Sequence, residues 1–220
     1  MGRSARRARL ARRLTPPVAA QRIPVRLPLF PLNTVLFPGG LLPLKVFEQR
    51  YIDMAKACLA DDRAFGVCLI TRGDEVARPG GKAPDFSAIG TTARITNWDM
   101  PQLGILHVAT LGGSRFLVER HSIEPSGLLV GEVKEIAAEP QVALTQAQQP
   151  LVRLLELIAT RVGPGNFPAD PDYGDASWVG YRLAEFLPLP LPIKQSMLEI
   201  NDAGVRLTVL QKFLSDQGLI

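Results

Sequence analysis

Two histidines, His107 and His121, and two cysteines, Cys58 and Cys68, are the side chains of this chain that zinc sites use most often. The histidines fall in neighbouring predicted strands and could approach each other, but no third ligand accompanies them. Solvated or hydrogen-bonded strand positions explain them better than a metal. The cysteines fit a reducing compartment, and two small buried apolar side chains are a simpler interpretation than a disulfide. We expect no metal and no cofactor.

Nucleophilic catalysis would need an activated Ser, Cys or Thr beside a base. The chain has no Gly-x-Ser-x-Gly motif, and Lys194 and Ser196 stand two residues apart, so they point to different sides of a predicted helix. Cys68 lies in a short apolar stretch, which favours packing over reactivity. Residues 79–84 (PGGKAP) lack the hydroxyl residue of a phosphate-binding loop and precede no predicted helix. The sequence therefore predicts a protein that is not an enzyme.

The charge is unevenly distributed along the chain. The formal net charge is +4, but residues 1–26 carry eight arginines and no acidic residue, and the rest has 17 basic against 21 acidic residues, a balance of −4. An acidic body argues against nucleic-acid binding, because such affinity comes mainly from neutralising phosphates. No run of apolar residues is long enough to span a membrane. We expect a cytoplasmic protein.

The basic amino-terminal tail, residues 1–24, has several interpretations. No apolar segment follows its arginines, which excludes a secretory signal. An organellar transit peptide and a nucleic-acid-binding arm both fit the composition. We favour a disordered extension, for which an upstream choice of start codon is one origin.

Hydrophobic periodicity divides the remainder into a β-rich part and a helical part. Strands are predicted over residues 25–32, 41–47, 65–71, 89–98, 106–111, 115–121 and 128–136, with a helix over 48–59 and a loop over 72–87. Gly112-Gly113 is predicted to be a hairpin turn. Helices are predicted over residues 145–162, 175–187, 192–200 and 205–214.

This order predicts an α+β fold. We expect a mixed, largely antiparallel sheet that curls into a partly open barrel at residues 25–140, followed by a helical subdomain at residues 141–220.

Several motifs, in order, resemble one family. They are Leu27-Pro-Leu-Phe-Pro-Leu32, Val35-Leu-Phe-Pro-Gly39, Leu42-Pro-Leu-Lys-Val-Phe-Glu-Gln-Arg-Tyr51, Asp62-Arg-Ala-Phe-Gly-Val67, Ile89-Gly-Thr91, Gly112-Gly-Ser-Arg-Phe116, Leu183-Ala-Glu-Phe-Leu187, Lys194-Gln-Ser-Met-Leu-Glu-Ile200 and Arg206-Leu207. Together they resemble the amino-terminal substrate-binding domain of Lon proteases over roughly residues 25–217. The chain carries no Walker motif and no Ser-Lys protease domain, and is similar to free-standing Lon-domain proteins, whose β unit is PUA-like.

The resemblance implies a non-catalytic module that binds polypeptide or a protease or chaperone partner, as an adaptor or regulator of proteolysis. Weak nucleic-acid binding through the PUA-like half and the Arg-rich tail is the alternative, and a homodimer is compatible with such a module. We expect an exposed apolar groove, placed between the β unit and the helices.

The candidate partner-binding residues are Phe47, Arg50, Tyr51 and Trp98. Each has a structural alternative. Core packing is the commoner fate of the two tryptophans, Trp98 and Trp178, and Arg50 could pair with a carboxylate.

Overall fold

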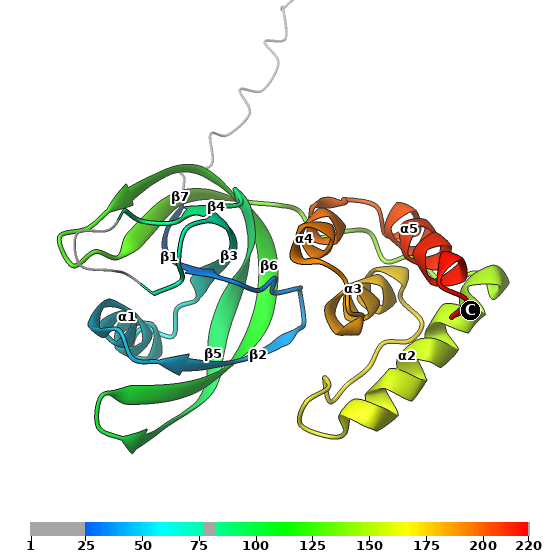
Figure 1. Cartoon of the computed structure of the whole chain (residues 1–220), viewed down its shortest axis with the longest axis horizontal. Coiled ribbons are helices and arrows are strands. Elements are labelled where there is room, and N and C mark those ends of the chain that lie inside the picture. The colour runs from blue at the N-terminus through cyan, green and yellow to red at the C-terminus, as the bar shows by residue number, and fades with distance from the viewer. Residues whose placement is uncertain (1–24, 77–81, 220) are drawn as a thin grey trace, which may run out of the picture.

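The fold is seen in a computed structural model that describes residues 25–76 and 82–219. It confirms the α+β class, with a β-rich half and a helical half side by side (Figure 1). The basic tail lies outside the described residues, so its interpretations stay predictions. Among the helices described, none is long and apolar enough to cross a membrane.

Five strands form a closed circuit of pairings. They are β1 (Val25–Leu32), β3 (Phe65–Arg72), β5 (Ile89–Gln102), β6 (Ile105–Ile123) and β7 (Leu129–Glu135). The order is β1-β7-β6-β5-β3, and β3 returns to β1 through the one parallel pairing of the circuit. Register shifts interrupt the β5–β6 and β6–β7 ladders, so the barrel is distorted. The expected mixed, largely antiparallel pseudo-barrel is confirmed.

A three-stranded ribbon extends from the barrel. It consists of β2 (Leu41–Val46), the first part of β6 and the last part of β5, with β6 in the middle. The hairpin turn between β5 and β6 is Leu103-Gly104, where Gly104 has a φ of 83° that glycine adopts readily. Figure 1 shows this hairpin projecting at the lower left, beyond the strands of the barrel.

The predicted hairpin turn at Gly112-Gly113 is wrong, because β6 runs through both glycines. Their role is close approach of a second segment. Gly112 exchanges backbone hydrogen bonds with Gly39 and Gly40, and a Cβ at Gly112 would lie 2.2 Å from the carbonyl oxygen of Phe37. Glycine is required there by space and not by turn geometry.

Substituting Gly112 with alanine should therefore lower the free energy of unfolding by about 1–3 kcal/mol, the usual cost of overpacking. The obstacle is backbone, which cannot rotate away. Gly113→Ala is the matched control, because its Cβ would meet the side-chain hydroxyl of Thr92 at 2.6 Å, which has more freedom to move. Urea unfolding of the two variants checks this. A larger loss for Gly113→Ala would contradict it.

The remaining elements of the β half are a helix and a short strand. Helix α1 (Gln49–Ala60) buries residues at three- and four-residue steps, as predicted. The predicted loop at residues 72–87 is partly wrong, because β4 (Asp85–Phe86) pairs with β3 inside it, and Arg72 belongs to β3 and bonds Asp85. A two-residue strand carries too little periodicity to be recognised in a Gly- and Pro-rich segment.

The helical half contains η1 (Gln146–Gln148), α2 (Gln149–Val162), α3 (Ala176–Phe186), α4 (Leu191–Glu199) and α5 (Ala203–Asp216). The four predicted helices are confirmed within a few residues. Asp175 and Asp202 cap α3 and α5 by accepting backbone N–H bonds from Trp178 and Val205. The cap at Asp202 explains why α5 begins two residues before its predicted start.

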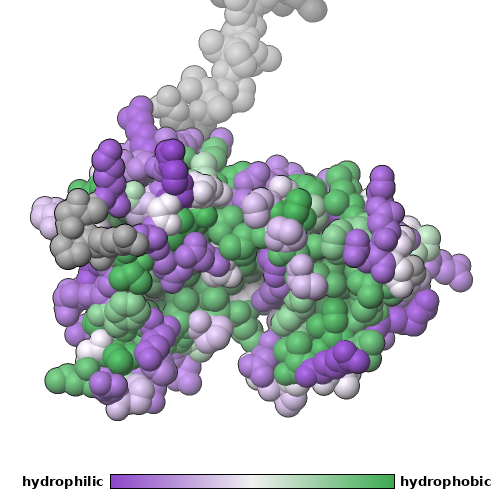
Figure 2. Space-filling model, in the orientation of Figure 1, coloured by the Kyte–Doolittle hydropathy of each residue, from purple (hydrophilic) through white to green (hydrophobic). Residues whose placement is uncertain are grey.

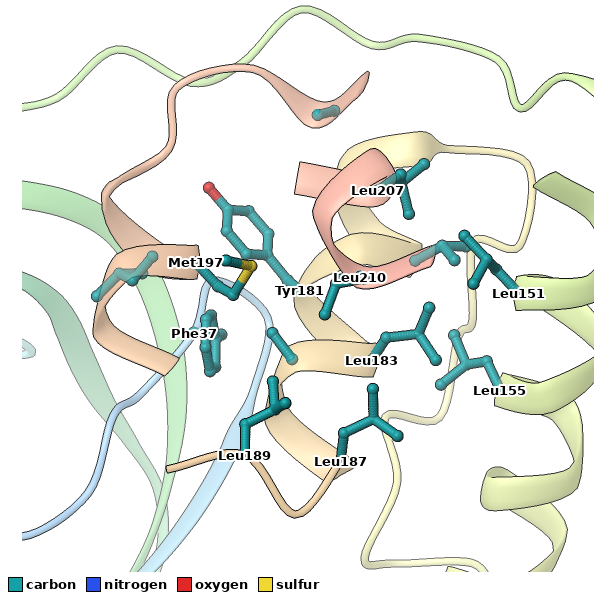
Figure 3. Packing of buried hydrophobic residues seen from close by; sticks show 14 of the residues in the cluster. Phe37, Leu151, Leu155, Tyr181, Leu183, Leu187, Leu189, Met197, Leu207 and Leu210 are labelled. Carbon is teal, nitrogen blue, oxygen red and sulfur yellow. The ribbon is translucent and has the colours of Figure 1, made fainter. Parts of the chain in front are cut away.

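The helical core is completed by a residue of the β half. Phe37, fully buried in the segment between β1 and β2, packs in the same cluster as Tyr181, Leu189 and Met197 (Figure 3). Its ring centroid lies 5.8 Å from that of Tyr181. The two halves therefore share apolar burial across their junction.

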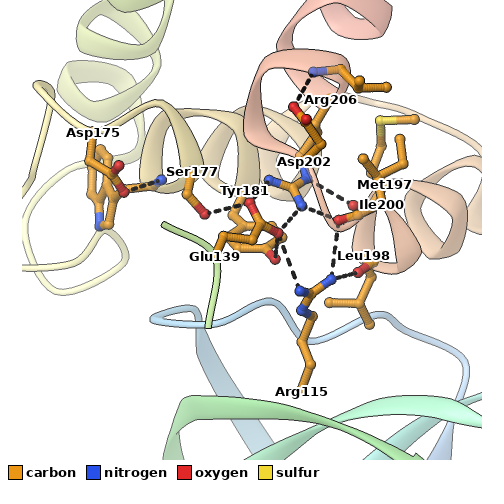
Figure 4. Close-up of polar contacts among 12 residues, drawn as sticks. Arg115, Glu139, Asp175, Ser177, Tyr181, Met197, Leu198, Ile200, Asp202 and Arg206 are labelled. Carbon is orange, nitrogen blue, oxygen red and sulfur yellow. Dashed lines mark hydrogen bonds and ion pairs between the residues drawn. The ribbon is translucent and has the colours of Figure 1, made fainter. Parts of the chain in front are cut away.

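A buried ionic cluster also joins the halves (Figure 4). Glu139, in the segment between β7 and α2, accepts hydrogen bonds from Arg206, Ser177 and Tyr181, the last at 2.6 Å, and lies 3.4 Å from Arg115 of β6. Its side chain is 3% exposed. Burial alone would raise the pKa of Glu139, but the bonds from Arg206 and Tyr181 outweigh it and lower that pKa. Glu139 thus remains ionised and ties β6 to α3 and α5.

Candidate functional site

Three large apolar side chains are exposed at the end of the ribbon. Phe47 is 53% exposed, Trp98 55% and Leu103 93%. Phe47 follows the pair Val46–Leu106, Trp98 is opposite Val108, and Leu103 lies in the turn that precedes β6. All three belong to the outer part of the ribbon, where Phe47 continues the face of Lys45 and Trp98 lies on the face of Val108, and we call them the apolar tip. Figure 2 shows hydrophobic surface at the end of this hairpin, among hydrophilic neighbours.

The strand register shows that the ribbon has two different faces. Leu44, Val108 and Trp98 form one row across the ribbon, on the face that packs into the core. The next row, Lys45, His107 and Asp99, has the opposite orientation and is exposed. Trp98, at the outer side of this row, is 55% exposed and does not belong to the core cluster that contains Val108. The core alternative is wrong for Trp98, whereas Trp178 does pack with Phe167 and Tyr173.

Arg50 and Tyr51 have different surroundings from Phe47 and Trp98. Arg50 pairs with Glu48 at 2.9 Å and donates to the carbonyl oxygen of Gly127 at 2.8 Å, which links α1 to the β6–β7 turn. Tyr51 is 2% exposed and stacks on Phe30 with ring centroids 3.9 Å apart. Its burial raises the pKa of its hydroxyl to about 12. Tyr51 therefore supports the region from inside the core and offers no contact surface.

A cavity of about 570 Å³ lies between α1 and the beginning of β1, and we call it the α1 cavity. Its apolar wall includes Leu27, Met54, Ala57, Cys58 and Leu128, and its remaining lining is Val25, Arg26, Pro28, Arg50, Asp53, Asp62, Arg63, Ala64, Arg94, Glu124 and Ser126. Its size is typical of a ligand-binding cleft. Of the four residues predicted from sequence, only Arg50 lines it.

The junction of the two halves, where we expected an apolar groove, holds a smaller cavity of about 350 Å³. Its lining includes Arg115, Glu139, Ser177 and Tyr181. These polar groups already bond one another, so they serve to hold the halves together. The more spacious apolar cleft lies within the β half.

The prediction that the two histidines lie on neighbouring strands is wrong, because both belong to the long β6. His107 is paired with Lys45 and Asp99, and His121 packs against Phe86 with ring centroids 5.1 Å apart. The misplaced hairpin turn caused this error. Both cysteines are free and buried, and burial raises the pKa of Cys68 to about 12. Neither is placed for nucleophilic chemistry.

Sequence reasoning missed Leu103 and the α1 cavity. The dipeptide Leu103-Gly104 followed by Ile105 was the available signal for the tip, since glycine there marks the turn. The cavity had no such signal, because its walls come from β1, α1, β5 and the β6–β7 turn, which meet only in the folded chain.

Comparison with known proteins gives consistent results. Residues 26–216 match the ATP-dependent protease La (LON) substrate-binding domain. A crystal structure of a Lon N-terminal domain protein from Xanthomonas campestris superposes with a TM-score of 0.69 at 35% identity, covering 86% of this chain and 98% of that one. The N-terminal domain of Mycobacterium avium complex Lon protease shares the fold, with a TM-score of 0.56 at 19% identity, covering 87% and 99%.

Full-length relatives are much longer. A Lon protease of Anaeromyxobacter dehalogenans is 41% identical over 91 residues, which cover 40% of this chain and 10% of that protein. A Lon protease of Cytophaga hutchinsonii is 25% identical over 203 residues, 88% of this chain and 24% of that protein. The chain thus spans no more than about a quarter of these full-length Lon proteases.

Proposed function

This chain belongs to the family of ATP-dependent protease La (LON) substrate-binding domains, and we propose that it binds unfolded polypeptide through the apolar tip. The observation that carries the proposal is the exposure of three large apolar side chains, Phe47, Trp98 and Leu103, in the outer part of the ribbon. Apolar side chains exposed to water are energetically unfavourable, and a partner that buries them removes this cost. Aromatic anchors with polar neighbours are typical of binding hot spots.

The double variant Phe47→Ser, Trp98→Ser should weaken binding of an unfolded protein at least about tenfold, which corresponds to about 1.4 kcal/mol. The probe is fluorescein-labelled, reduced and carboxymethylated lactalbumin, titrated with the full chain and followed by anisotropy. Native lactalbumin serves as the folded ligand, which should bind weakly to both proteins.

A matched control is the double variant Leu157→Ser, Val205→Ser, whose side chains are 53% and 51% exposed on the helical half. It removes as many exposed apolar groups and should leave the affinity unchanged. Loss of binding in this control, with binding kept in the tip variant, would move the site to the helices.

We further propose that the bound polypeptide is presented to a protease or chaperone, which makes the chain an adaptor or regulator of proteolysis. The relatives named as Lon proteases support this class of partner. The expected result is a changed rate of degradation of unfolded lactalbumin by an ATP-dependent protease when the chain is added. The predictions of a homodimer, of weak nucleic-acid binding and of a cytoplasmic location stay predictions.

A further inference from the structure

One edge of β1 has no strand beside it at the start of the strand. Val25–Leu29 pair with β7 on one side, whereas pairing with β3 on the other side begins only at Leu29. In the described part of the chain, no ladder covers the second edge of residues 25–28. An unpaired edge offers backbone N–H and C=O groups to another extended chain.

This edge is open because the chain before β3 turns away from it. Continuing the β1–β3 register backwards from Leu29–Gly66 would place Ala64 opposite Leu27. Instead, Asp62, Arg63 and Ala64 lead back to α1 and form the opposite wall of the α1 cavity. The cavity is therefore the gap between two strands that would otherwise be neighbours, and an additional extended segment would occupy it.

The lining of the α1 cavity indicates what kind of occupant it accepts. Its arginines are each paired with a carboxylate: Arg26 with Glu124, Arg50 with Glu48, Arg63 with Asp61 and Arg94 with Asp62. With Asp53, whose carboxylate accepts a hydrogen bond from Gln49, the lining carries four arginines and three acidic residues, which favours an occupant of little net charge at this point. The buried Nε of Arg50 has no hydrogen-bond partner among the described residues, and a backbone carbonyl is a suitable acceptor.

We propose that a short extended segment of the polypeptide bound by this domain occupies the α1 cavity as an additional strand beside Val25–Pro28. The inference rests on the proposed function and adds a mode of recognition to it. Main-chain hydrogen bonds to β1 supply affinity for any sequence, and the wall formed by Met54, Ala57 and Cys58 accepts an apolar side chain. Pro28 lacks an N–H group, which limits the pairing to a short segment.

The test uses a soluble fluorescein-labelled peptide in which Val alternates with Lys and Glu in turn, so that it carries no net charge, and the same peptide N-methylated at every second amide. Ala57→Trp fills the cavity from the exposed side of α1, and Lys56→Trp, the adjacent exposed residue outside the lining, is its control.

Ala57→Trp and N-methylation should each weaken binding about tenfold or more. Lys56→Trp should bind as the wild type does. Hydrogen exchange within Arg26–Leu27, where one of the two amides faces the open edge, should slow when the unmodified peptide is bound.

Equal binding by Ala57→Trp and Lys56→Trp, or equal binding of the two peptides, would overturn the inference. Labelled unfolded lactalbumin, titrated in parallel, separates this failure from failure of the proposed function. If lactalbumin binding depends on Phe47 and Trp98 but not on Ala57, the tip binds polypeptide and the cavity does not. If the wild type binds no unfolded lactalbumin, the proposed function itself is wrong, and the inference fails with it.

Discussion

Replacing Glu139 with glutamine is expected to lower the free energy of unfolding by about 3–5 kcal/mol, the usual cost of breaking a buried ion pair. Glu139 is the only carboxylate that the described structure pairs with the buried guanidinium groups of Arg115 and Arg206. Glutamine keeps the volume but leaves those two charges without a counterion. Urea unfolding at neutral pH measures the loss, and Glu156→Gln, an exposed residue of α2, should change stability by less than about 0.5 kcal/mol.

The pH dependence of this loss has a definite sign. The pKa of Glu139 is held below its ordinary value of 4.5, so the native state binds its proton less readily than the unfolded state does. The stabilisation is fully present above pH 4.5 and disappears as the pH falls through the lowered pKa. The stability difference between wild type and Glu139→Gln should therefore be constant near neutrality and shrink in acid. A difference that grows in acid would contradict the ionised state of Glu139.

Phe37→Ala is expected to cost a similar amount, about 3–5 kcal/mol, because it leaves a cavity in a packed core. Phe37 is 0% exposed, whereas Phe47, ten residues later, is 53% exposed. Phe47→Ala is therefore the control and should cost about 0.5 kcal/mol or less. Urea titration followed by circular dichroism gives both values.

The same variant tests whether the halves unfold together. Phe37 comes from the β half, yet it packs in the helical cluster. Trp98 reports on the β half and Trp178 on the helical half, so versions in which one tryptophan is replaced by phenylalanine isolate each signal. We expect the two midpoints to coincide and to shift equally in Phe37→Ala. A shift confined to Trp178 would mean that the halves are stabilised independently.

Local patterns predicted most of the secondary structure. The 3.6-residue period of α1 and the proline and glycine boundaries of the later helices depend on neighbours in sequence, and these predictions are confirmed. Gly112-Gly113 was misassigned because the same residue type serves turns and close backbone approaches. Gly112 is needed because the carbonyl oxygen of Phe37 lies close to it. Phe37 is 75 positions away in the chain, so the residues around Gly112 do not indicate this contact.

The exposure of the candidate contact residues could be predicted only in part. Phe47 and Trp98 were chosen as candidate contacts, and both are exposed, whereas Tyr51 is covered by Phe30. Sequence periodicity places Tyr51 on the inner face of α1 but does not say how far that face extends. The ionic cluster of Arg115, Glu139 and Arg206 joins three distant segments, and no spacing rule could have assembled it.

The most direct test of polypeptide binding is hydrogen exchange of the full chain, alone and with unfolded lactalbumin. Our account predicts slower exchange at the end of the ribbon, around residues 97–108, and at residues 25–28, with the helices α2 to α5 unchanged. Protection confined to the helical half, or none at a lactalbumin concentration that saturates the anisotropy signal, would contradict it.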